Sequence, residues 1–139
     1  MTTAPVEYVV VQFPGPRFTV EVAHAIAELA QSTTIRVLDL VFVAKAADGT
    51  VVARELEELE ELAELRGIDG EIGGLIGAED IEYVSATLEP GTSVALLLWE
   101  DLWAQPIAEA LTHDGAVLAE GARIPRDLIE PALARVDPA

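Results

Sequence analysis

Three near-continuous apolar segments, each about as long as a β-strand, constrain the fold of this chain most. They cover residues 6–13, 35–45 and 92–99, and all are rich in valine, leucine or isoleucine. Runs of this length without strict polar alternation are typical of strands that are buried on both faces of a sheet. The third run is the most apolar, so we expect it at the centre of the sheet.

Segments with helical periodicity separate these strands. Apolar residues recur at helical spacing over residues 19–32, and Thr19 is placed to act as the N-cap. An Asp48-Gly49 pair before residues 51–54 predicts a β-hairpin. Residues 116–122 predict another strand. Further helices are predicted at residues 55–66, 78–88, 102–113 and 126–136.

These elements predict an α+β, ferredoxin-like fold in which two βαβ halves share one mostly antiparallel sheet. Residues 6–54 would form the first half and residues 92–136 the second, joined by an acidic helix and a glycine-rich connector at residues 55–91. The tripeptide Ile-Ala-Glu at residues 26–28 recurs at residues 107–109, which is consistent with a duplication. At 139 residues, the chain (1–139) fits a single domain.

The charge of the chain excludes several partners. There are 25 acidic against 8 basic residues, a formal net charge of −17, although 51% of the residues are hydrophobic. Disordered acidic chains are poor in large apolar residues, so we expect the charge to coat the packed core of a folded, soluble protein. The charge disfavours nucleic acids and anionic membranes, and no segment reads as a membrane span or signal peptide. We therefore expect a cytoplasmic protein.

No motif for catalysis, a metal or a cofactor is present in the sequence. The chain has no cysteine and two histidines, His24 and His113, neither of which has a second histidine at ligand spacing. Thiolate zinc sites and thiol nucleophiles are excluded, and a histidine-based site would need distant partners. We expect no catalytic residue, no metal and no cofactor.

The least ordinary segment is an acidic helix followed directly by glycines. Glutamates crowd residues 55–64 around leucines at every third position, and five glycines follow within residues 67–77. The glycines match no phosphate-binding loop, and the glutamates match no EF-hand. For the glutamates, a solvated face, divalent-cation capture and a basic partner protein stay open. The apolar side chains, with Trp103, form a candidate interaction surface: Leu56, Leu59, Leu62, Ile72, Leu75, Ile76 and Trp103.

Three segments resemble a bacterial family known only as a domain of unknown function. They are VEYVVVQFPG at residues 6–15, IRVLDLVFV at residues 35–43 and EPGTSVALLLWE at residues 89–100. The family has no established activity, so the resemblance implies no catalytic residue. More distantly, the chain resembles stress-associated proteins with a long glycine-rich, membrane-type insert. Here only residues 70–77 occupy that place, so the resemblance does not imply membrane association.

Three functions are consistent with the sequence. Long apolar strands and alanine-rich helices predict a non-enzymatic module that self-associates as a dimer or larger assembly. An alternative is a small-molecule sensor or enzyme with a pocket between sheet and helices, lined by Tyr8, His24, Glu100 and Trp103. A third is an acidic adaptor that binds a basic protein through residues 55–64.

Overall fold

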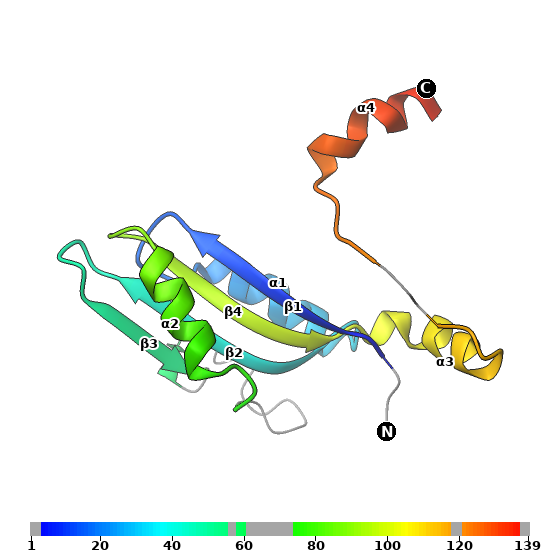
Figure 1. Cartoon of the computed structure of the whole chain (residues 1–139), viewed down its shortest axis with the longest axis horizontal. Coiled ribbons are helices and arrows are strands. Elements are labelled where there is room, and N and C mark those ends of the chain that lie inside the picture. Colours follow the sequence, from blue (N-terminus) through cyan, green and yellow to red (C-terminus); the bar gives the residue numbers. More distant parts are fainter. Residues whose placement is uncertain (1–3, 56–57, 61–73, 118–120, 137–139) are drawn as a thin grey trace.

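The computed structural model describes residues 4–55, 58–60, 74–117 and 121–136, and its centre is one four-stranded sheet. The strand order is β1-β4-β2-β3, and all neighbouring strands are antiparallel (Figure 1). The predicted apolar strands are confirmed, and the most apolar of them, β4, lies inside the sheet. The strands are β1 Val6–Phe13, β2 Arg36–Lys45, β3 Val51–Glu55 and β4 Ser93–Glu100.

The helices lie on both faces of the sheet and beyond one end of it (Figure 1). Helix α1 covers one face and α2 the other, whereas α3 and α4 stand away from the sheet. The predicted N-cap is confirmed, since the Thr19 hydroxyl accepts a hydrogen bond from the Val22 amide at 3.4 Å. The helices are α1 Val20–Gln31, α2 Ala78–Thr87, the short 3₁₀ turn η3 Leu102–Ala104, α3 Gln105–His113 and α4 Arg126–Val136.

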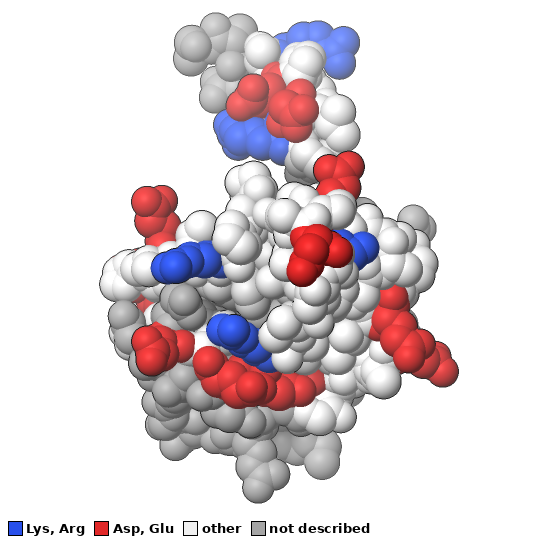
Figure 2. Space-filling view, turned by 90° about the vertical axis from the view of Figure 1, so that its left-hand side faces the viewer, with Lys and Arg blue, Asp and Glu red and all other residues white. Residues whose placement is uncertain are grey.

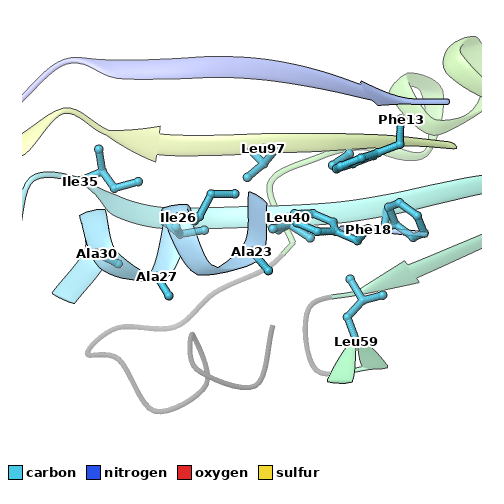
Figure 3. Close-up of a cluster of buried hydrophobic side chains, with 13 residues drawn as sticks. Phe13, Phe18, Ala23, Ile26, Ala27, Ala30, Ile35, Leu40, Leu59 and Leu97 are labelled. Carbon is cyan, nitrogen blue, oxygen red and sulfur yellow. The ribbon is translucent and has the colours of Figure 1, made fainter. Parts of the chain in front are cut away.

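The larger core lies between α1 and the sheet. The buried face of α1 presents Ala23, Ala27 and Ala30 around Ile26, and these small residues let the helix lie close to the strands (Figure 3). At one end of this core the ring of Phe18 lies 5.0 Å from that of Phe13 and 5.8 Å from that of Phe42. Below them Leu59, which is 2% exposed, points toward Phe18 (Figure 3).

A smaller core lies on the opposite face, under α2. Buried side chains of β2 and β4 meet partly buried side chains of α2 and its flanking residues: Val41, Val43, Val94 and Leu96 on the sheet, and Ile76, Ile81, Val84 and Leu88 above it. No residue of α2 is itself fully buried. This layer therefore covers only part of the face, and the α2 side of β1 stays exposed.

A β-bulge in β2 decides which side chains face which core. The register shifts between Val37, which pairs with Trp99, and Asp39, which pairs with Leu98. The extra residue is Leu38, and it reverses the alternation that follows. As a result Leu40 joins the core under α1, while Asp39 turns to the α2 face.

The specific ferredoxin-like arrangement is not confirmed. Strands β1 and β2 are parallel with β4 between them, and β3 and β4 are parallel with β2 between them. Two right-handed crossovers in this order would bring both helices to the same face, as ferredoxin-like folds require. Helices α1 and α2 instead cover opposite faces, so one connection departs from the right-handed rule.

The second predicted half also differs from the structure. Residues 116, 117, 121 and 122 are not in a strand, so the strand predicted at residues 116–122 does not form in the part described. The helix predicted at residues 102–113 is present as η3 and α3, but no strand follows it to complete a second βαβ unit. In the structure, β4 is connected to β3 through α2, so the described residues after the second Ile-Ala-Glu copy do not form a second βαβ unit.

The acidic helix and most of the glycine-rich connector lie outside the described residues. Of the segment at residues 55–66, Glu55 ends β3, and residues 58 and 60 have 3₁₀-helical conformation. Of the glycines in the connector, Gly74 and Gly77 are described, the first with a positive φ of 81°. No helix of the described chain has the length and apolarity needed to cross a bilayer.

Candidate functional site

The C-terminal arm, defined here as residues 105–117 and 121–136, exposes an unusual amount of apolar surface. Neither α3 nor α4 contains a buried residue. In Figure 1 α4 stands clear of the sheet. The large apolar side chains that the arm exposes are Ile107 at 62%, Val117 at 81%, Ile124 at 60%, Leu128 at 70%, Leu133 at 42% and Val136 at 82%.

Helix α4 is amphipathic, with an apolar half and a charged half. At 3.6 residues per turn its larger apolar side chains fall on one half of the helix, and its charged side chains fall on the other half. The apolar half holds Leu128, Ile129, Ala132, Leu133 and Val136. A helix of this kind is normally stable only when its apolar half is covered, because packing supplies most of the stability of a short helix.

The last segment of the arm differs in charge from the rest of the chain. Residues 121–136 contain three arginines, Arg123, Arg126 and Arg135, against Asp127 and Glu130, which gives this segment a formal charge of +1. The whole chain carries −17. The arginines of this segment can therefore pair with carboxylates of the acidic surface, whether in its own copy or in another.

A groove lies between α2 and β1 on the α2 face. We call it the α2–β1 groove, and its volume is about 630 Å³. It lies beside the open edge of the sheet, where Val6, Tyr8 and Val10 are 55%, 51% and 45% exposed. The groove is lined by Val10, Gln12, Phe13, Pro14, Val84, Thr87, Leu88, Glu89, Thr92, Ser93 and Val94.

One acidic side chain lies in the α2–β1 groove. Of the residues that line it, Glu89 is the charged one. Helix α2 carries Glu79 and Asp80 in its first turn, where they stabilise the positive end of the helix. Burial raises the pKa of the Tyr8 hydroxyl, and the negative charge of Asp80 raises it further, so this carboxylate acts on the exposed part of β1. The groove therefore combines apolar side chains with one carboxylate.

A pair of carboxyl groups connects the arm to the sheet. Glu7 lies on β1, Asp101 follows β4, and their side chains are hydrogen-bonded to each other. Arg123 of the arm forms an ion pair with Glu7 through Nη2 and Oε2. The Nε1 group of Trp99 donates a hydrogen bond to Asp101 Oδ1 at 3.0 Å, and the Asp101 amide donates to the Pro5 carbonyl at 2.7 Å.

The carboxyl groups of Asp101 and Glu7 differ in pKa, so one of them holds a proton while the other is ionised. Burial and the neighbouring Glu7 carboxylate raise the pKa of Asp101 to about 6, although the hydrogen bonds from Trp99 and Trp103 oppose the shift. Hydrogen bonding to Asp101 and the charge of Arg123 lower the pKa of Glu7. The arrangement therefore favours a protonated Asp101 that donates to an ionised Glu7, which in turn holds Arg123.

Glu100 lies beside this pair but faces the opposite side of the sheet. It is 4% exposed, and its Oε1 accepts hydrogen bonds from Arg36 Nη2 and, at 2.9 Å, from Arg36 Nε. Its Oε2 has no hydrogen-bond partner within the part of the chain that the structure describes. The described residues contain no cluster of three or more acidic or histidine side chains placed to hold a metal ion.

Asp39 is a structural residue that sequence reasoning missed. Its side chain is 1% exposed, and its Oδ2 accepts hydrogen bonds from the backbone amides of Leu75 at 2.8 Å and Ile76 at 2.6 Å. The Leu40 amide donates to its Oδ1 at 2.8 Å. Asp39 thus anchors the chain that leads into α2. The available signal was an acidic residue in the middle of an otherwise apolar strand.

The predicted interaction surface is placed only in part. Leu56, Leu62 and Ile72 lie outside the described residues. Leu59 is buried in the core under α1, whereas Ile76 packs under α2 on the opposite face. Leu75 and Trp103 are 61% and 64% exposed. The structure therefore does not bring the described members of this set together.

The four residues predicted to line a pocket are also dispersed. Tyr8 faces the α2 side of the sheet, while His24 lies on the exposed side of α1, with Nε2 at 3.1 Å from Glu28 Oε1. Glu100 is paired with Arg36, and Trp103 follows β4 in η3. None of the four lines the α2–β1 groove or a second cavity, which lies on the α1 face.

The fold and these surfaces define a class: an α+β protein with a four-stranded antiparallel sheet, one helix on each face and an exposed C-terminal arm. A family model matches residues 2–136 of the chain, and it describes DUF6325, a family of unknown function. The chain belongs to this family, and the expectation of an uncharacterised family is confirmed. No curated protein and no solved structure matches the chain.

Proposed function

We propose that this protein is a non-enzymatic module that self-associates by exchanging its C-terminal arm. The apolar half of α4 from one copy would lie in the α2–β1 groove of a second copy. The observation that carries the proposal is the arm itself, because α3 and α4 have no buried residue while their large apolar side chains are exposed. Reciprocal exchange of the two arms would give a closed dimer with twofold symmetry.

A second copy is favoured as the occupant by charge and by length. The segment with α4 carries +1 in a chain of −17, and the charged residue that lines the groove is Glu89. Arg126 and Arg135 lie on the charged half of α4, so they can reach such a carboxylate while the apolar half faces the groove. With 11 residues, α4 is about as long as α2, which has 10, and can lie along it.

Several expectations stay part of this proposal. They are that residues 1–139 form one domain, that the protein works in the cytoplasm and that its distant relatives are stress-associated bacterial proteins. The strand, helix, strand opening and the Pro90-Gly91-Thr92-Ser93 approach to β4 support the last of these. Binding of a basic partner by the acidic segment at residues 55–64 is an alternative use of the same negative charge.

The proposal is tested on the arm by comparing two single substitutions. Leu128→Glu places a charge on the apolar half of α4, and Ala134→Glu adds the same charge to the opposite half. Losing one buried leucine costs about 2 kcal/mol, so Leu128→Glu should weaken the dimer by more than tenfold. Multi-angle light scattering and sedimentation equilibrium over about 1–100 μM measure the mass and the dissociation constant.

The groove is tested by a second matched pair. Val10→Glu alters the groove, whereas Val20→Glu alters a valine that is 69% exposed at the start of α1, on the other face. We expect the first change to weaken the dimer and the second to leave it unchanged. A wild-type protein that stays at the monomer mass of 14.8 kDa at every concentration contradicts self-association. Equal effects within either pair contradict arm exchange.

A further inference from the structure

A second cavity lies on the α1 face, at the end of the sheet where the β1–α1 loop meets the β2–β3 hairpin. Its volume is about 880 Å³, within the range of small-molecule sites in proteins. The residues predicted to line a pocket, Tyr8, His24, Glu100 and Trp103, do not line this cavity. The residues that line it are Pro16, Arg17, Phe18, Phe42, Ala44, Lys45, Ala46, Ala47, Thr50, Val52, Arg54, Leu59 and Gly91.

The floor of this cavity is apolar and rigid. Phe18, Phe42 and Leu59 are 2%, 5% and 2% exposed, and the two rings pack on each other in the core. Val52, which is 46% exposed, lies on the same face of the hairpin. The buried floor is thus held by the main core and does not depend on a ligand to form.

The charged residues that line this cavity are all basic. Arg17 and Arg54 make no ion pair with any residue that the structure describes, although acidic residues outnumber basic ones by 25 to 8 in the chain. The Lys45 ammonium group donates to the Leu88 carbonyl at 2.9 Å on the other face, so it is already engaged. Figure 2 views this end of the molecule and shows basic side chains next to both uncharged and acidic surface.

We propose that this cavity binds an amphiphilic carboxylate, a molecule with an apolar body and one anionic head. The body would lie on the floor formed by Phe18, Phe42 and Leu59, and the head would pair with Arg17 and Arg54. Guanidinium groups suit this task because they stay charged and present paired donors that match a carboxylate. The cavity and the α2–β1 groove lie on opposite faces, so this site is independent of the proposed self-association.

The acidic character of the chain makes the site selective for amphiphiles. A small anion without an apolar body gains only the contact with two partly solvated arginines and meets the repulsion of a net charge of −17. An apolar body removes additional surface from water, at about 25 cal/mol for each Å² buried. Decanoate is therefore expected to bind at micromolar to submillimolar concentration, and acetate is expected not to bind at 1 mM.

Isothermal titration of the full chain with decanoate, decan-1-ol and acetate tests the site. In the variant Arg17→Gln/Arg54→Gln, binding of decanoate should weaken by at least tenfold, while binding of decan-1-ol should not change. Both arginines are on the surface, and circular dichroism verifies that the variant is folded. The matched control is Ala25→Glu/Gln31→Glu, which changes the net charge by the same amount at two exposed positions of α1 and should bind decanoate like the wild type.

Three results would overturn the proposal. The first is the absence of decanoate binding to the wild type at 1 mM. The second is unchanged decanoate affinity in Arg17→Gln/Arg54→Gln, and the third is an equal loss in the α1 control, which would show a general effect of charge. Because the titration does not depend on the mass of the particle, a monomeric protein that binds decanoate would contradict arm exchange and still support this site.

Discussion

At the scale of single residues, Asp39 shows how one buried carboxylate organises a layer of the fold. The bulge at Leu38 turns Asp39 away from the main core, and its oxygens then accept three backbone amides, from Leu40, Leu75 and Ile76. A buried charge is costly unless it is satisfied in this way. The carboxylate therefore links the β2 bulge to the segment that precedes α2.

Replacing Asp39 by alanine should destabilise the protein by about 3 kcal/mol. The change leaves backbone amides without their charged acceptor, and each hydrogen bond to a charged group contributes about 1.5–3 kcal/mol. Urea unfolding followed by circular dichroism measures the loss. The control is Asp114→Ala, at an exposed residue after α3. A loss below about 1 kcal/mol, or one equal to the control, would contradict the anchoring role.

The Asp101–Glu7 pair makes a second prediction at this scale, on the pH dependence of stability. The pKa of Asp101 is raised from 3.8 to about 6, so between these values the folded protein holds a proton that the unfolded chain has released. Stability from this group is therefore present at low pH and is lost as the pH rises through about 6. The lowered pKa of Glu7 acts in the opposite sense, but at more acidic pH, below its ordinary value of 4.5.

The variant Asp101→Asn cannot ionise and should lose less stability with rising pH. Between pH 5 and pH 7.5 the titration of Asp101 lowers the free energy of unfolding of the wild type by about 1 kcal/mol, and the variant lacks this loss. Urea unfolding at both pH values gives the two differences, and subtraction cancels the general repulsion of the acidic surface. Equal differences for the two proteins would show that Asp101 does not titrate in this range.

At the scale of elements, local patterns were sufficient for most strands and helices. The apolar runs that became β1, β2 and β4, the Thr19 cap and the Asp48-Gly49 turn all act within a few residues. In the hairpin, the Asp48 carboxylate accepts the Thr50 amide at 2.9 Å, and Gly49 has a positive φ of 91°, which suits glycine. Each of these features is caused by residues that are close to it in the sequence, so a local pattern can predict it.

The predictions that differ from the structure depend on distant partners. The described ends of the predicted strand 116–122 have the composition of a strand, but a strand needs a neighbour, and these residues follow α3, which leaves the sheet. The four residues of the candidate pocket are dispersed for the same reason. Tyr8 and His24 are placed on different faces by the topology, which no local pattern specifies. The bulge that turns Asp39 is likewise set by pairing between β2 and β4.

At the scale of the whole molecule, net charge opposes the association that the arm favours. Two copies approach with −17 each, and this repulsion acts over distances longer than a contact. The proposed contacts between the arginines of α4 and Glu89 of the groove act at short range. Salt screens the long-range repulsion between the two copies more than it screens these short-range contacts, because the Debye length falls from about 30 Å at 0.01 M to about 8 Å at 0.15 M.

Raising the salt concentration should therefore strengthen the dimer. From 10 to 150 mM NaCl the dissociation constant is expected to fall on the order of tenfold, equivalent to about 1.4 kcal/mol. Sedimentation equilibrium at both concentrations measures it, and Leu128→Glu serves as the control, since it should remain weakly associated in both. An adaptor that binds a basic protein through residues 55–64 would show the opposite dependence, because salt weakens attraction between unlike charges. A dissociation constant that rises with salt would show that charge attraction, and not the apolar half of α4, holds the two copies together.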